Sequence, residues 1–148
     1  MDLLEYQGKQ LFSKHDVPVP AGRPASTVPQ AVDAADELGY PVVVKAQVLI
    51  GGRGKAGGIK LAKDRHEAEQ HAQAILGMDI RGFTVHELYI EKASDIAEEY
   101  YAAIVFDRGA KAPMAMHIKR YEQRKLKDAK RFSIDTRMSE RCRLTHPG

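Results

Sequence analysis

Apolar positions recur along residues 1–116 with two different periods. Three segments show near-helical spacing, and each is followed by a proline pair or a glycine that ends a helix. We expect these helices at residues 3–15, 27–39 and 64–77. Short β-branched and apolar runs predict strands at residues 41–49, 59–62, 85–91 and 100–106, with another around Met114 after a turn at residues 107–109. This order predicts an α/β (α+β) fold.

Charge divides the chain at about residue 116. The formal net charge is +3, but residues 117–148 hold ten Lys and Arg against four Asp and Glu, whereas residues 1–116 hold 13 against 16. Aliphatic residues are also sparse between Tyr121 and Arg131. We therefore expect residues 1–116 to form the folded segment and residues 117–148 to be a basic tail that is disordered or non-native.

Composition also excludes several protein classes. With 43% hydrophobic and 29% charged residues, the chain resembles soluble globular proteins. It has neither an apolar run of about 20 residues, which a membrane helix needs, nor the apolar start of a signal peptide. We therefore expect a cytoplasmic protein. Cys142 is the single cysteine, and neither it nor the six histidines show a metal-binding or catalytic spacing.

The segment Gly51–Gly58 has five glycines in eight residues, together with Arg53 and Lys55. Such a loop lets backbone N–H groups approach phosphate oxygens while the cations supply charge. A dinucleotide fingerprint would open a helix, but the residues that follow are typical of a strand, and no P-loop spacing is present. A glycine hairpin over phosphates therefore fits best, and a plain surface hairpin is the alternative.

Lys45 interrupts an apolar strand, where an unpaired ammonium would be costly to bury. Strand alternation places it beside the glycine loop, where it would contact a nucleotide phosphate. The alternative is a lysine that extends to solvent from an edge strand. Glu91 ends a strand and is followed by Ser94 and Glu99, whose oxygens could accept hydrogen bonds from a base or a ribose, although a solvated acidic loop would look the same.

Four motifs together resemble the β subunits of succinyl-CoA synthetases, which are ATP-grasp acid–CoA ligases. They are Glu5-Tyr-Gln, Lys45-Ala-Gln-Val, the glycine loop, and Glu91-Lys-Ala-Ser-Asp-Ile-Ala-Glu-Glu-Tyr100. The resemblance implies an incomplete amino-terminal ATP-grasp lobe. It places Lys45 and Gly52-Arg53-Gly54 on the phosphates of ATP, Glu91 and Ser94 toward the base, and Glu99 near the ribose.

The resemblance also implies the reaction of ADP-forming succinate–CoA ligase in the citric acid cycle, in which succinate, CoA and ATP give succinyl-CoA, ADP and phosphate. The phosphorylated histidine would belong to a partner α subunit. The Mg²⁺ ligands would lie in a carboxy-terminal part that these 148 residues do not include, so this chain alone is expected to be inactive. Malate–CoA ligase β subunits share the same region and remain an alternative.

The resemblance ends at Ala115-Met116, after which the sequence differs from the small, acidic stretch of that family. A shifted reading frame or a truncated gene would explain this change. Two other functions stay open: a nucleic-acid-binding module that uses the basic tail, which has few aromatic residues, and a regulatory protein that binds ATP without chemistry.

Overall fold

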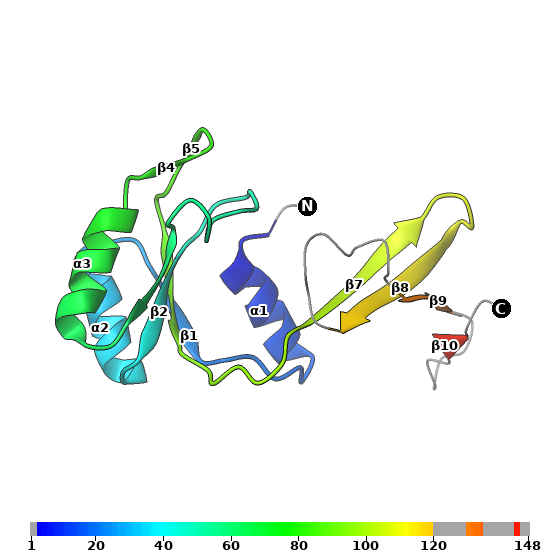
Figure 1. The fold of residues 1–148 in the computed structure, drawn as a ribbon, viewed down its shortest axis with the longest axis horizontal. Coiled ribbons are helices and arrows are strands. Elements are labelled where there is room, and N and C mark those ends of the chain that lie inside the picture. The colour runs from blue at the N-terminus through cyan, green and yellow to red at the C-terminus, as the bar shows by residue number, and fades with distance from the viewer. Residues whose placement is uncertain (1–2, 120–129, 135–143, 146–148) are drawn as a thin grey trace. The chain divides into compact units, whose positions relative to one another are not determined.

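The chain folds as two units, the first ending at Ser94 and the second beginning at Asp95. The computed structural model describes residues 3–119, 130–134 and 144–145 (Figure 1). Helices and strands are mixed in the first unit, and the described elements of the second are strands. The predicted α/β (α+β) class is therefore confirmed.

The first unit is built on a four-stranded antiparallel sheet with the order β1-β6-β2-β3. Its strands are β1 (Gly22–Ala25), β2 (Val42–Ala46), β3 (Ile59–Ala62) and β6 (Leu88–Lys92). The two central strands, β2 and β6, are the richest in β-branched and large apolar residues, which suit a pleated surface that is covered on both faces. β1 is an edge strand and contains Pro24, a residue that sheets accept at edges because it lacks an N–H donor.

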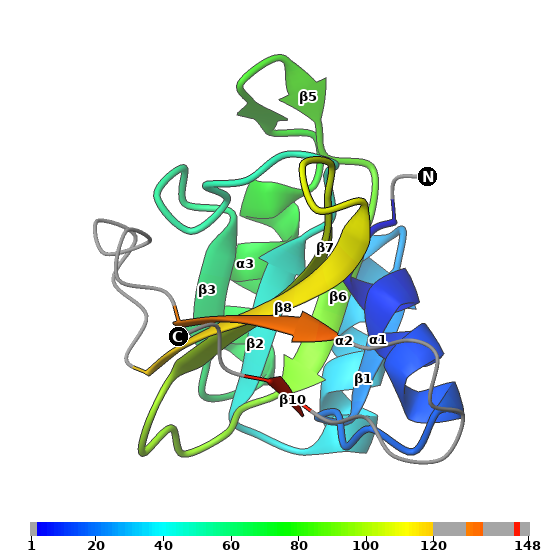
Figure 2. The ribbon, with the colours of Figure 1, turned by 90° about the vertical axis from the view of Figure 1, so that its right-hand side faces the viewer.

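Three helices cover the two faces of this sheet. α2 (Val28–Leu38) and α3 (Arg65–Ile75) pack together on one face, whereas α1 (Glu5–Lys14) lies on the other (Figure 1, Figure 2). All three helices were predicted, with ends within a few residues of those observed. Among the described residues, no helix is both long enough and apolar enough to cross a bilayer.

The starts of α2 and α3 are capped by side chains. Thr27 Oγ1 accepts a hydrogen bond from Gln30 N at 3.4 Å, and Asp64 Oδ1 accepts one from Glu67 N at 2.9 Å. These bonds satisfy N–H groups that have no partner within the helix. Each cap is completed by a second hydrogen bond. The Gln30 side chain accepts from Ser26 N at 2.9 Å, and the Glu67 side chain accepts from Lys63 N at 2.8 Å.

The core lies between the sheet and α2 with α3. It is built largely from alanines of the helices and from aliphatic residues of β2 and β6, a combination that lets helices approach the sheet closely. Its fully buried members include Ala35, Ala72, Ile75, Val42, Val44, Leu88 and Ile90. Since apolar burial is the main source of folding free energy, this layer fixes the sheet in place.

A short hairpin that was not predicted from the sequence joins α3 to β6. It pairs β4 (Asp79–Ile80) with β5 (Phe83–Thr84), and both turn residues, Arg81 and Gly82, have positive φ. Two positive φ values are the requirement of the two-residue turn that suits the twist of a hairpin. Asp79 Oδ1 further accepts a hydrogen bond from Gly82 N at 3.0 Å.

The second unit contains an antiparallel sheet with the order β10-β9-β8-β7. Its strands are β7 (Tyr100–Asp107), β8 (Ala112–Lys119), β9 (Lys130–Ile134) and β10 (Leu144–Thr145). The β7–β8 turn, predicted from Asp107-Arg-Gly109, is closed by Asp107 Oδ1, which accepts from Gly109 N at 2.8 Å and from Ala110 N at 3.1 Å.

The boundary expected after residue 116 falls inside β8, which continues to Lys119 and pairs with β9. The other residues of the expected tail, namely 120–129, 135–143 and 146–148, lie outside the described residues. The disorder expected for the tail therefore stays a prediction.

Candidate functional site

Lys45 lies on the face of the sheet that carries α1. Within β2, Val42, Val44 and Ala46 are buried toward α2 and α3, whereas Val43 and Lys45 point the other way and are partly exposed. β2 lies between β6 and β3, so the interpretation of Lys45 as a residue of an edge strand is wrong. The expectation that its ammonium needs an anionic partner is met by two carboxylates, Glu91 and Glu5.

Glu91 reaches Lys45 diagonally across the β2–β6 pair. In the register, Lys45 is opposite Tyr89 and Val43 is opposite Glu91, which puts all four side chains on one face. Lys45 Nζ donates to Glu91 Oε1 at 2.6 Å, and Lys9 of α1 binds the other carboxylate oxygen. The side chain of Glu91 is only 9% exposed, so these two cations satisfy a nearly buried charge.

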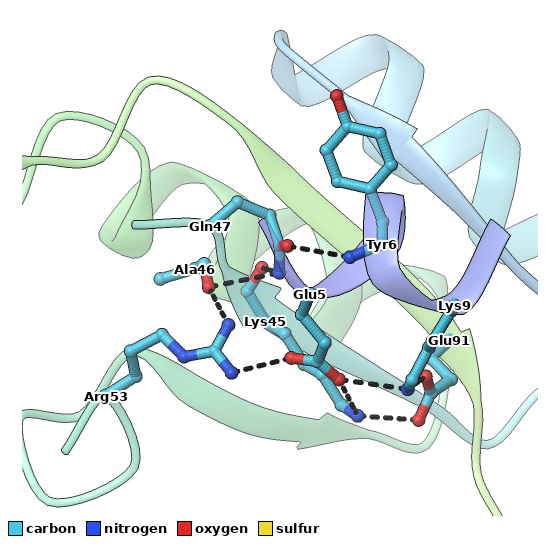
Figure 3. Close-up of polar contacts among 8 residues, drawn as sticks. All are labelled: Glu5, Tyr6, Lys9, Lys45, Ala46, Gln47, Arg53 and Glu91. Carbon is cyan, nitrogen blue, oxygen red and sulfur yellow. Dashed lines mark hydrogen bonds and ion pairs between the residues drawn. The ribbon is translucent and has the colours of Figure 1, made fainter. Parts of the chain in front are cut away.

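Glu5, in the first turn of α1, connects three cations (Figure 3). Its Oε1 lies 2.9 Å from Lys9 Nζ and 3.1 Å from Lys45 Nζ, and its Oε2 accepts from an Nη of Arg53 at 2.7 Å. Burial alone would raise the pKa of the Glu5 carboxyl, but the hydrogen bond from Lys9 and the charges around it lower that pKa to about 2. Glu5 is therefore ionised at neutral pH.

Arg53 belongs to the glycine loop that joins β2 to β3 in the predicted hairpin. One Nη donates to Ala46 O at 2.8 Å while the other binds Glu5. The Arg53 carbonyl in turn accepts from Gly58 N at 2.9 Å. The loop thus folds back on the end of β2 and places the guanidinium beside Lys45.

Glycine is required at particular positions of this loop. Gly52 and Gly57 have φ of +87° and +83°, a region that other residues rarely adopt. At Gly58, an added Cβ would lie 2.9 Å from Ile80 Cδ1 and 3.1 Å from Ala46 Cβ. Gly54 lies in the same loop, where an added Cβ would meet only Ile59 at 3.8 Å.

Contacts of Gln47, Tyr6 and Tyr89 complete the attachment of α1. Gln47 is 4% exposed and accepts from Tyr6 N at 3.3 Å through its Oε1. The rings of Tyr6 and Tyr89 stack with centroids 6.2 Å apart, and Lys9 Nζ lies 5.4 Å from the centre of the Tyr89 ring. Burial raises the pKa of both tyrosines, which therefore stay neutral at physiological pH.

Lys9 is held as a cation by its carboxylate neighbours. Burial alone would lower the pKa of this ammonium, but hydrogen bonds to Glu91 and Glu5 outweigh it and raise the pKa. We name Glu5, Lys9, Lys45, Arg53 and Glu91 the charge cluster. With three cations and two carboxylates it has a net charge of +1, which favours an anionic ligand.

Residues 2–120 match the ATP-grasp domain family. The chain belongs to the ATP-grasp family. Among curated proteins, the β subunit of the ADP-forming succinate–CoA ligase of Halorubrum lacusprofundi is 52% identical over 116 residues, which make up 78% of this chain and 30% of that protein. The subunit of the same name from Haloarcula marismortui is 51% identical over 116 residues, with the same shares. The resemblance to succinyl-CoA synthetase β subunits is therefore confirmed.

This ATP-grasp chain spans about 30% of the length of those curated relatives. Among solved structures, the dinucleotide-forming acetyl-coenzyme A synthetase 1 of Ca. Korarchaeum cryptofilum, in complex with coenzyme A, Ca-AMPCP and HgCl+, has a TM-score of 0.78 at 20% identity. The similarity covers 94% of this chain and 62% of that one. At this identity the likeness shows the fold alone, and it agrees with the expected incomplete ATP-grasp lobe.

Four predicted site residues lie outside the charge cluster: Gly52 and Gly54, which flank Arg53 in the glycine loop, and Ser94 and Glu99. Ser94 is exposed at the end of the first unit, and Glu99 is an exposed residue of the second unit, just before β7. The structure brings together Lys45, Arg53 and Glu91 from the predicted set. It adds Glu5 and Lys9, which sequence reasoning did not single out as site residues.

The described residues do not form a magnesium site. Within the described part of the chain, no group of three or more His, Cys, Asp or Glu could hold a metal ion. The carboxylates of Glu5 and Glu91 are each bound by two or more cationic side chains, which a divalent ion would have to displace. The expectation of Mg²⁺ ligands in a further carboxy-terminal part stays a prediction.

Proposed function

We propose that this ATP-grasp segment binds ATP through the charge cluster, with Lys45 and Arg53 on the phosphates. The observation that carries the proposal is their placement: a strand lysine and a loop arginine meet where a glycine-rich hairpin leaves β2. Backbone N–H groups of such a loop can approach phosphate oxygens closely because the glycines have no side chains.

Lys45 and Arg53 retain the capacity to bind a phosphate in addition to their protein partners. Two of the three N–H donors of Lys45 are used by Glu91 and Glu5, and Arg53, with five donors, makes bonds to Ala46 O and Glu5. Arginine and lysine also bind phosphate differently, one as a planar fork and the other as a point charge. Together they would fix both the position and the orientation of the chain of phosphates.

The roles of the other predicted residues belong to the same proposal. Gly52 and Gly54 flank Arg53 and would let the backbone approach the phosphates. Ser94 would face the base and Glu99 the ribose, and the support for these two roles is the family resemblance. Glu91 would act next to the base site mainly by holding Lys45, because its carboxylate is already bound by two ammonium groups.

For the whole protein we propose the reaction of an ADP-forming succinate–CoA ligase, the name of its relatives: succinate, CoA and ATP give succinyl-CoA, ADP and phosphate. Malate is the alternative acid. A partner α subunit would carry the phosphorylated histidine, and the proposed compartment is the cytoplasm. Because phosphoryl transfer needs a metal ion that bridges phosphate oxygens, we expect no turnover by these 148 residues alone.

Calorimetric titration of the 148-residue chain with ATP tests the binding proposal. Lys45→Met keeps most of the side-chain stem but removes the charge, so ATP should bind about 10- to 100-fold more weakly, as expected for one charged hydrogen bond. Lys60→Met is the matched control, because Lys60 is exposed on β3 opposite Val44, on the other face of the sheet. Equal ATP affinity in the unsubstituted chain and in Lys45→Met would contradict the assignment of Lys45.

A further inference from the structure

Glu5 contacts both cations that the proposed function places on the phosphates. One carboxylate oxygen lies 3.1 Å from Lys45 Nζ and the other 2.7 Å from an Nη of Arg53. The two cations come from different kinds of segment: Lys45 lies in a strand that is paired on both sides, whereas Arg53 lies in a glycine-rich loop. A rigid carboxylate between them would therefore mainly restrict the arginine.

Among the described residues, the Arg53 guanidinium donates to Glu5 and to one other acceptor, the carbonyl of Ala46 at 2.8 Å. A single hydrogen bond leaves a long side chain free to rotate about that bond. The second bond, to Glu5, fixes the plane of the guanidinium, and with it the direction of its remaining N–H donors. Ordering such a side chain before binding lowers the entropy cost of binding itself.

Glu5 is itself held firmly. Lys9, one turn further along α1, binds the same oxygen as Lys45, and Tyr6 N donates to the buried Gln47. α1 has no fully buried residue, so these polar contacts supply much of its attachment to the sheet. The low pKa of the Glu5 carboxyl keeps it charged throughout the neutral range.

We propose that Glu5 is a positioning residue that holds Arg53 and Lys45 side by side, so that both meet the phosphates of one nucleotide. This inference rests on the proposed function. The opposite role is also physically clear: a carboxylate between two cations could occupy the place of the phosphate and compete with it. The two roles predict opposite signs for the effect of removing the charge of Glu5.

The first test is calorimetric titration of the 148-residue chain with ATP. Glu5→Gln should weaken ATP binding about 10-fold, since it removes a charged hydrogen-bond acceptor from Arg53 and Lys45. Glu37→Gln is the matched control: Glu37 of α2 forms an exposed ion pair with Arg23 of β1, and the same chemical change there should leave the affinity unchanged. Tighter or unchanged ATP binding by Glu5→Gln would overturn the proposal.

A double-mutant cycle separates positioning from a general role in holding α1. If Glu5 acts through Arg53, then Glu5→Gln should lose most of its effect on ATP affinity in a chain that already carries Arg53→Met. A purely structural role would give the same loss of affinity in both backgrounds, and that result would overturn the proposal.

Limited trypsin digestion without nucleotide tests the hold on Arg53 independently of ATP. Cleavage after Arg53, measured relative to cleavage after Lys60 in β3, should be several-fold faster in Glu5→Gln than in the unsubstituted chain or in Glu37→Gln. If the unsubstituted chain binds no ATP but this difference is present, the proposed function fails while the hold of Glu5 on Arg53 is supported. An unchanged cleavage ratio would overturn the positioning role, whatever the result with ATP.

Discussion

The two faces of the first sheet are covered by helices in different ways. α2 and α3 pack against β2 and β6 through fully buried alanines and aliphatic residues. α1 has no fully buried residue and is attached through the charge cluster, a hydrogen bond to Gln47 and the stacked rings of Tyr6 and Tyr89. The layer between the sheet and α2 with α3 is apolar, whereas the layer between the sheet and α1 is largely polar.

The two faces of the sheet should therefore contribute differently to the stability of the fold and to ligand binding. Close-packed apolar layers tolerate little change, because removed atoms leave cavities that the structure fills only partly. Exposed and partly exposed ion pairs each contribute little to stability, but they place charges at defined positions. We therefore expect substitutions on the α2–α3 face to affect mainly unfolding, and those on the α1 face mainly ligand affinity.

The largest effect on stability should come from adjacent valines on opposite faces of β2. Val44 is fully buried toward α2 and α3, whereas Val43 is partly exposed on the face of the charge cluster. Val44→Ala should lower the free energy of unfolding by about 2–3 kcal/mol, from about 0.8 kcal/mol per buried CH₂ plus the cavity left behind. Val43→Ala should cost about 1 kcal/mol or less.

Urea unfolding of the two valine variants measures this difference. Equal losses from Val43→Ala and Val44→Ala would contradict the division of the sheet into a dry and a polar face.

Gly58 is the residue of the glycine loop that packs against the apolar core. An alanine there would bring its Cβ to 2.9 Å from Ile80 Cδ1 and close to Ala46, so Gly58→Ala should cost about 1–3 kcal/mol in the free energy of unfolding. Gly51→Ala is the control, since nothing lies within 4 Å of an added Cβ and its φ is not positive. Thermal unfolding of both variants measures this difference. If Gly58→Ala were as stable as the unsubstituted chain, the loop would have to move away readily.

An effect on stability smaller than those expected at Val44 and Gly58 should come from the Glu5 carboxyl, and it should depend on pH. Its pKa of about 2 in the folded chain lies below the ordinary 4.5, so its contribution is complete above pH 4.5 and is lost as pH falls through about 2. At about 1.36 kcal/mol per pKa unit, discounted for a side chain that is partly exposed to solvent, the contribution is about 1–2 kcal/mol.

Urea unfolding at pH 7 and pH 3 would reveal this contribution. The unsubstituted chain and Glu37→Gln should lose more stability at the lower pH than Glu5→Gln does. Equal losses in all three chains would show that Glu5 has no such linkage.

Local patterns in the sequence predicted the helices and the hairpin that frames the glycine loop. They worked because caps, alanine stripes and β-branched runs are signals carried by neighbouring residues. β1 was not predicted, since Gly22-Arg-Pro-Ala25 lacks the β-branched residues of a typical strand. Its role as an edge strand comes from pairing with β6, which is distant in sequence.

The same distinction, between local signals and contacts distant in sequence, explains which residues of the candidate site were predicted. Lys45 and Arg53 were found because a lysine in an apolar strand and a cation in a glycine loop are locally unusual. Glu5 was noticed only as part of a family motif, since its contacts with Lys45 and Arg53 span 40 and 48 residues and depend on how α1 attaches to the sheet. The pairing of Glu91 with Lys45 likewise depends on the register between β2 and β6.

An NMR titration of the ¹⁵N-labelled 148-residue chain with ATP tests whether Lys45 and Arg53 form a phosphate site. We expect the amide signals of residues 51–58 and of Lys45 to shift most, and inorganic tripolyphosphate to shift the same signals while adenosine does not. Shifts confined to other residues, or equal shifts with adenosine, would contradict this expectation.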